Sequence, residues 1–100
     1  MEFWIKDGKL LTWLDPSRRI QETVIASGVV DGDYNSSLNE WLVTRENGVV
    51  EALSGHLRIA SRRYSSQGLS AKWNGSSVVV RESDGRSRVY DNRGFLERTL

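Results

Sequence analysis

The chain has no cysteine, one proline and one histidine among its 100 residues, and it has no long apolar run. Without cysteine there is no disulfide framework, no thiolate nucleophile and no zinc–thiolate site. No stretch approaches the roughly 20 apolar residues that a membrane-spanning helix needs, and the first residues, MEFWIKDG, lack the basic and apolar regions of a signal peptide. These absences predict a soluble, cytoplasmic protein of one domain, residues 1–100, with no membrane contact and no cofactor.

The net charge of +1 is unevenly spread along the chain. Residues 1–50 carry 5 Lys and Arg against 8 Asp and Glu, whereas residues 51–100 carry 9 against 5. All the cations of the second half except Lys72 are arginines, whose planar fork suits phosphate and carboxylate groups. The balance is much less basic than in a typical nucleic-acid domain, so solvent-facing strand arginines are favoured over a dedicated anion site.

Three copies of one pattern dominate the sequence. In each copy a turn dipeptide lies between two apolar runs, and the dipeptides are Asp7-Gly8, Asn47-Gly48 and Asp84-Gly85. Such dipeptides tolerate the positive φ of a two-residue type I′ turn, so each predicts a hairpin. The glycines are 40 and 37 residues apart, a spacing typical of propeller blades and similar arrays.

We therefore expect an all-β fold, an antiparallel meander of repeated hairpins with about nine to eleven strands. It would form a small barrel or roll, or propeller-like blades. Each copy has a third strand after a second turn, and the segments GVVDGDY and LSAKWNG offer a fourth strand to the second and third copies. A helix within residues 37–64, giving an α+β fold, is the rival, because Ser37 and Glu40 match a capping box and apolar residues follow at helical spacing.

The turns also predict strand register. Pairing of Lys6 with Lys9 makes the first hairpin apolar on both faces. Pairing of Ser83 with Arg86 would set Arg81 opposite Arg88, which is unfavourable unless an anion or a carboxylate such as Glu82 lies between them.

The segment VVDGDYNSSLNEWLVTRENGVVEAL, within residues 28–53, resembles a blade of the FG-GAP/integrin-type β-propeller repeats. In that family an aspartate-rich loop leads into a strand, a Gly turn and a returning strand, and the loop binds calcium. The resemblance implies Asp31, Asp33 and Asn35 as ligands. The chain departs from the pattern at Ser36, where the family has glycine, and at Asn39, where it has an acidic ligand. We therefore predict no metal site and interpret the segment as a polar turn joining two strands.

Catalytic residues are not predicted. The single histidine, His56, follows a Ser-Gly turn and has no evident orienting carboxylate or nucleophile in the sequence. The aspartates 7, 15, 84 and 91 occupy turn positions where Asp is favoured for backbone reasons. The chain is therefore expected not to be an enzyme.

Binding is the remaining functional lead, because four tryptophans are many for a chain of this size. The leading hypothesis is a protein-interaction module that binds a protein partner through a β face lined by Trp and Arg. The alternative is a binder of an anionic ligand or nucleic acid through the Arg-rich strands 81–88. The residues assigned to partner or anion binding are Trp73, Arg81, Arg86, Arg88 and Tyr90. A homodimer is also expected, through the apolar first hairpin or the last strand.

Overall fold

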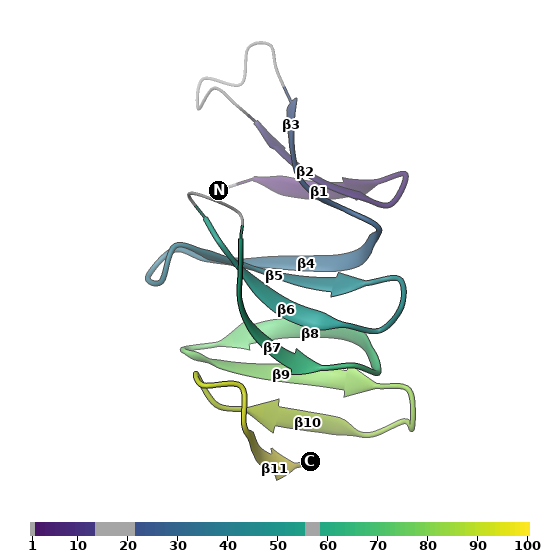
Figure 1. The fold of residues 1–100 in the computed structure, drawn as a ribbon, viewed down its shortest axis with the longest axis vertical. Helices are drawn as coiled ribbons and strands as arrows, with labels where there is room; N and C mark the ends of the chain where they lie inside the picture. The colour runs from purple at the N-terminus through teal and green to yellow at the C-terminus, as the bar shows by residue number, and fades with distance from the viewer. Residues whose placement is uncertain (1, 14–21, 56–58) are drawn as a thin grey trace.

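The computed structural model describes residues 2–13, 22–55 and 59–100, and these form an elongated stack of β-sheets (Figure 1). Its principal extents are 43 × 27 × 19 Å. The strands follow one another along the chain, and their bounds are β1 Phe3–Lys6, β2 Lys9–Trp13, β3 Glu22–Ser27, β4 Val29–Asn35, β5 Glu40–Arg45, β6 Val50–Ser54, β7 Ala60–Ser65, β8 Gly68–Asn74, β9 Ser77–Glu82, β10 Ser87–Tyr90 and β11 Leu96–Thr99.

The strands form three antiparallel meanders, each built from strands consecutive in the chain. The N-terminal sheet contains β1–β3, the middle sheet β4–β7 and the C-terminal sheet β8–β11. β4 and β8 are the extra first strands expected from GVVDGDY and LSAKWNG, and β1 has no such strand before it in the described residues. The prediction of an all-β fold made of repeated antiparallel hairpins is therefore confirmed, and the three sheets are compatible with blade-like units.

Two alternatives weighed from the sequence do not form. The proposed helix within 37–64 is replaced by strands β5, β6 and β7, because cross-strand pairing overrides the local helical spacing. The described strands do not close into a barrel, because the first and last of them belong to different sheets. Residues 14–21, with the predicted turn at Asp15, and residues 56–58, with His56, lie outside the described part of the chain.

All three glycine dipeptides make hairpin turns, but only the first is the predicted type. Asp7 and Gly8 both have positive φ, 54° and 72°, as a type I′ turn requires. In the second turn the Gly48 N–H donates to Arg45 O and the Arg45 N–H to Val49 O, at 3.0 and 2.7 Å. This is a type I turn closed by a left-handed glycine, one residue longer than predicted.

The third turn has the same longer form, which corrects the register predicted for the third hairpin. Gly85 N–H donates to Glu82 O at 3.0 Å, and Arg81 pairs with Ser87 rather than with Arg88. Arg88 lies opposite Val80 instead, so the predicted clash of like charges does not arise. The register of the first hairpin, with Lys6 opposite Lys9, is confirmed.

Apolar side chains fill both gaps between neighbouring sheets. One core joins the N-terminal and middle sheets around Leu10 and Trp41, and Phe3 meets the Trp41 ring edge-on at 5.4 Å. The other core joins the middle and C-terminal sheets around Leu42, Val78 and Val80. The middle sheet therefore has a core on both of its faces, and each outer sheet packs one face against it.

Candidate functional site

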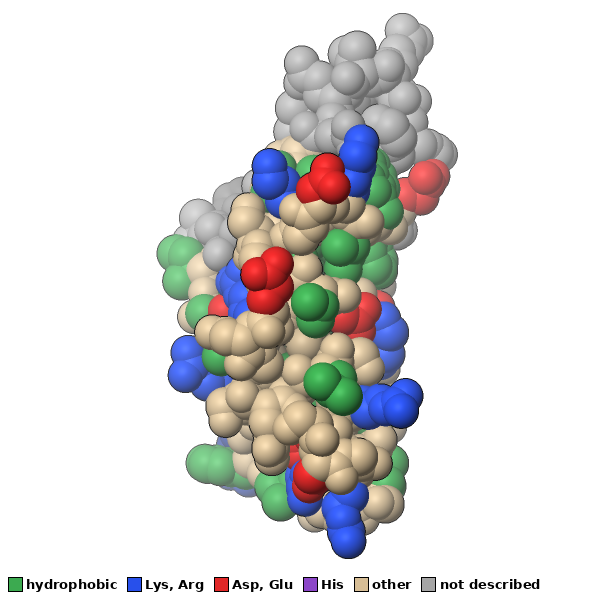
Figure 2. Space-filling model, turned by 90° about the vertical axis from the view of Figure 1, so that its right-hand side faces the viewer, with side chains coloured by type: hydrophobic (Ala, Val, Ile, Leu, Met, Phe, Trp, Pro, Cys, Tyr) green, Lys and Arg blue, Asp and Glu red, His purple; other side chains and the backbone are tan. Residues whose placement is uncertain are grey.

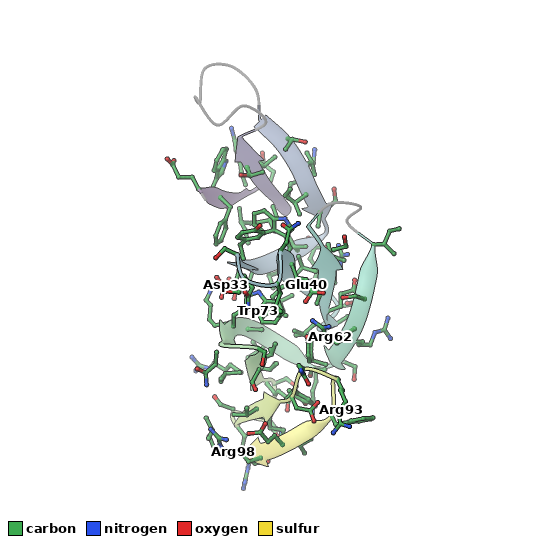
Figure 3. The ribbon with its side chains drawn as sticks, turned by 90° about the vertical axis from the view of Figure 1, so that its left-hand side faces the viewer. Asp33, Glu40, Arg62, Trp73, Arg93 and Arg98 are labelled. Carbon is green, nitrogen blue, oxygen red and sulfur yellow. The ribbon has the colours of Figure 1, made fainter. Side chains whose placement is uncertain are left out.

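Two aspartates of β4 hold the C-terminal sheet in place. An Asp31 carboxylate oxygen accepts the backbone N–H of Ala71 at 3.1 Å, and an Asp33 oxygen accepts that of Trp73 at 2.9 Å. Both donors belong to β8, an edge strand whose N–H groups would otherwise lack partners. Figure 3 shows Asp33 and Trp73 side by side at this junction.

This junction explains the residues that the sequence offered as a weak calcium loop. Asp31, Asp33 and Asn35 lie along a strand, not in a loop or turn, so the predicted polar turn is also wrong at these positions. The carboxylates of both aspartates accept N–H donors, and the Lys72 ammonium group contacts Asp31 at 3.1 Å. Among the described residues no cluster of three or more His, Cys, Asp or Glu side chains is placed to hold a metal ion.

Two of the predicted binding residues contribute instead to a buried network around Glu82. The Glu82 side chain is 1% exposed, and it accepts hydrogen bonds from Tyr90 Oη at 2.8 Å, Arg88 Nη1 at 2.6 Å and the Ser65 hydroxyl. Arg88 also contacts Asp84 at 2.8 Å. Since Ser65 belongs to the middle sheet, this carboxylate links the two sheets.

Burial alone would raise the pKa of the Glu82 carboxyl. The hydrogen bonds that it accepts outweigh burial, so its pKa lies below the ordinary value of 4.5. Burial and the hydrogen bond to Glu82 raise the pKa of the Tyr90 phenol, which therefore stays protonated and donates. Arg88 and Tyr90 are thus occupied within the fold, and the anion that Arg88 neutralises is Glu82.

A second network of the same kind lies on the middle sheet. Arg62 pairs with the Glu40 carboxylate, and its Nε donates to Tyr64 Oη at 2.9 Å. Figure 3 shows Glu40 and Arg62 directed toward each other in the gap between the sheets.

Trp73 lines an open pocket where the β4–β5 and β8–β9 turns meet. Its indole N–H is buried and has no hydrogen-bond partner in the described part of the chain. Two of the lining residues are hydrogen-bonded to each other, since Asn35 Nδ2 donates to Gly75 O at 2.8 Å. The pocket measures about 480 Å³, and its lining is Tyr34, Asn35, Ser36, Ser37, Leu38, Trp73, Gly75 and Ser76.

The C-terminal sheet has one face packed against the middle sheet and one face turned away from it. Arg81 lies on the face that is turned away. Cross-strand partners share a face, so the register assigns residues to this C-terminal end face. They are Ser70, Lys72, Asn74, Ser77, Val79, Arg81, Ser87, Val89 and Arg98. Val89 is buried, Val79 is half-buried, and Arg81 and Arg98 are exposed.

The middle sheet shows what normally covers such a face. Its corresponding residues are Leu42, Thr44, Val50 and Ala52, each at most 1% exposed beneath the C-terminal sheet. In the C-terminal sheet their places are taken by Val79, Arg81, Ser87 and Val89. At two of these positions the side chain is more polar in the C-terminal sheet: Ser87 replaces a valine, and the charged Arg81 replaces a threonine.

Charge on the end face is reversed relative to the middle sheet. The covered face of the middle sheet carries three acidic side chains, Asp31, Asp33 and Glu40, and one cation, Arg62. The end face carries three cations, Lys72, Arg81 and Arg98, and no acidic side chain among the residues assigned to it. Arg98 corresponds to Arg62, but its only described ionic contact is with its exposed neighbour Glu97 at 2.8 Å.

The five predicted binding residues therefore divide between three places. Arg81 lies on the end face, with Arg86 exposed in the adjoining β9–β10 turn. Arg88 and Tyr90 face inward to Glu82, and Trp73 lines the pocket. The sequence analysis names Glu82 as a possible carboxylate partner of Arg88 but does not predict its burial, and it assigns no role to Arg98. Aligning the third copy with the second strand by strand would have marked Arg98 as the counterpart of Arg62.

Along the side of the stack, cationic, acidic and small apolar patches are interspersed (Figure 2). In the described residues no helix is long and apolar enough to cross a membrane. No protein-family model matches the chain, and no significant match is found among curated proteins.

Proposed function

We propose that this chain is a non-enzymatic protein-interaction module that binds an acidic protein surface through its C-terminal end face. One observation carries the proposal. The face of the middle sheet that another sheet covers is mainly acidic, whereas the corresponding face of the C-terminal sheet, the end face, is cationic. A face with the half-buried Val79 at its centre and exposed arginines around it suits a partner that offers carboxylates and a small apolar contact.

The cations of the end face differ in availability. The ammonium group of Lys72 pairs with Asp31 of the middle sheet, so we expect Lys72 to contribute less to partner binding than the arginines. Arg98 is 56% exposed, and its contact with Glu97 is a surface ion pair of small worth, which an incoming carboxylate can replace. Arg81 and Arg98 are therefore the residues expected to bind the partner.

Nucleic acid is the alternative class of partner, and the lack of an aromatic side chain among the residues assigned to the end face favours protein. Stacking platforms for bases need exposed rings beside the cations. Trp73 and Tyr90 pack with Val78 toward the middle sheet, on the side opposite the end face. The end face thus combines charge with aliphatic rather than aromatic surface.

A binding titration with two probes tests the proposal. The probes are a labelled oligoglutamate peptide and a labelled single-stranded oligonucleotide of the same length, measured by fluorescence anisotropy at several salt concentrations. We expect the double reversal Arg81→Glu/Arg98→Glu to weaken peptide binding at least about tenfold. The matched control is Arg63→Glu/Arg93→Glu, which makes the same charge change at exposed positions away from the end face and is expected to have little effect.

Equal loss in both double variants would show a nonspecific charge effect and contradict the proposal. Tighter binding of the oligonucleotide, with a steep salt dependence, would favour the nucleic-acid alternative.

A further inference from the structure

One strand position is unoccupied in the described stack, at the opposite end from the C-terminal end face. The second strand of the middle sheet, β5, pairs with β4 on one side and β6 on the other, and β9 pairs likewise with β8 and β10. The corresponding strand of the N-terminal sheet, β1, pairs only with β2 within the described residues.

Side-chain exposure reflects this difference. Ile5 lies opposite Leu10, and its counterpart Thr44 lies opposite Val50, the matching position of the next hairpin. Ile5 is 38% exposed, whereas Thr44, which has the β4 residue Asp31 beside it, is 1% exposed. Among the described strands, none occupies the side of β1 that faces away from β2, and an additional strand could pair there.

The backbone of β1 is oriented for such a strand. Lys6 and Lys9 flank the two-residue turn and so form a hydrogen-bonded pair. Because pairs alternate along an antiparallel ladder, the N–H and C=O groups of Phe3 and Ile5 point away from β2.

The middle sheet shows what a strand in this position does. Asp31 and Asp33 of β4 accept the N–H groups of Ala71 and Trp73 in the sheet below. β4 pairs with β5 as β8 pairs with β9. In this comparison Gly32 and Tyr34 of β4 correspond to Ala71 and Trp73 of β8. The Tyr34 N–H is turned the same way, outward from β5, and bonds its own neighbour Asp33 at 3.0 Å. Alternation along the strand turns the Gly32 N–H in that direction too.

We propose that β1 binds an extended segment of a partner protein, antiparallel, with Asp or Asn at two alternate positions. The side chain opposite Ile5 accepts the N–H of Gly32, and the one opposite Phe3 accepts the N–H of Tyr34. This is strand addition, in which main-chain bonds give affinity and the alternate side chains give specificity. Lys6 and Lys9 are exposed at the turn end of the same edge and complement an acidic segment.

The chain supplies its own probe. A synthetic peptide with the sequence of residues 28–36, GVVDGDYNS, carries the acidic residues at the required spacing. We expect it to slow amide exchange at Phe3 and Ile5 and to shift the NMR resonances of Gly32 and Tyr34. Replacing both aspartates of the peptide by alanine is expected to weaken binding at least about tenfold, because two charge-assisted hydrogen bonds are lost.

Two controls separate strand addition from general stickiness. A peptide of the same composition with the aspartates at adjacent positions cannot place both carboxylates on one face, and is expected to bind no better than the alanine peptide. N-methylation of the peptide amides that face β1 removes the main-chain bonds while the protein stays unaltered, and is expected to abolish binding.

Three results would overturn the proposal. The first is perturbation confined to Ala71 and Trp73, which would mean that the peptide replaces β4 in its own sheet. The second is concentration-dependent protection of Phe3 and Ile5 without peptide, which would mean that a second copy occupies the edge. The third is the absence of any protection at β1 at the highest soluble peptide concentration. None of these depends on the end face, so this proposal and the proposed function fail separately.

Discussion

Replacing Glu82 by Gln removes the charge at the centre of the network that joins the middle and C-terminal sheets. Gln has the same size, but it places an NH₂ group where a carboxylate oxygen stood. The groups around this position, from Ser65, Arg88 and Tyr90, are all hydrogen-bond donors. Either Arg88 or the pair of hydroxyls from Ser65 and Tyr90 then faces a donor instead of an acceptor.

Breaking a buried ion pair from one side costs about 3–5 kcal/mol. Arg88 retains Asp84 at 2.8 Å and is 20% exposed, which places the expected loss near the lower limit, at about 3 kcal/mol. For a chain of this size the loss corresponds to a fall in Tm of roughly 12–24 °C. Urea denaturation followed by Trp fluorescence measures the free energy of unfolding directly.

The matched control is Glu97→Gln, which removes the same charge from an exposed pair with Arg98 and is expected to cost less than about 1 kcal/mol. If Glu82→Gln also cost less than about 1 kcal/mol, the network would not join the sheets as argued.

The pH dependence gives a second readout of the same residue. The pKa of Glu82 is lowered by folding, so its contribution to stability is present above the ordinary pKa of 4.5 and is lost as pH falls through the folded-state pKa. The difference in unfolding free energy between the wild type and Glu82→Gln should therefore be constant near neutral pH and shrink in acid. A difference that grows in acid would contradict the assigned direction.

Four further predictions concern the glycine turns, the contact between β4 and β8, calcium binding and self-association. Gly48→Val should lose more than about 1 kcal/mol and more than Gly85→Val, because a Cβ at Gly48 would lie 2.8 Å from Ser66 O while Gly85 faces open space; urea denaturation of both variants compares them. Asp33→Ala should accelerate hydrogen exchange at the Trp73 backbone amide, because the amide loses its acceptor. Unchanged exchange would show that the hydrogen bond between Asp33 and Trp73 does not stabilise the contact between the two sheets. Added calcium should leave Tm unchanged, and a rise that disappears in Asp31→Ala would establish a metal site. Light scattering should find a symmetric dimer formed through the exposed edge strand β11, and a monomer at the highest soluble concentration would reject it.

The hairpins could be predicted from the sequence because Gly-containing turn dipeptides and β-rich runs act locally. The form of the turns could not, since Asn47-Gly48 suits both a type I′ turn and a type I turn with a left-handed glycine. That one-residue difference decides which side chains oppose each other, so the predicted pairing of Arg81 with Arg88 is wrong.

The candidate site was harder to predict, because its residues are brought together by stacking of sheets. Arg81 and Arg86 could be identified as exposed strand and turn cations. The burial of Arg88 and Tyr90 against Glu82 could not, because Ser65 reaches this carboxylate from another sheet. The resemblance to FG-GAP repeats implies Asp31 and Asp33 as calcium ligands. Their role in the structure, accepting N–H groups of β8, depends on a strand about 40 residues away.

The central claim is that the C-terminal end face binds an acidic partner, and NMR mapping of the bound oligoglutamate peptide tests it most directly. The account predicts that amide and side-chain resonances shift at Arg81, Ser87, Val89 and Arg98, and that the shifts vanish in Arg81→Glu/Arg98→Glu. Shifts centred on the Trp73 pocket, or shifts at the end face that survive the double reversal, would contradict it.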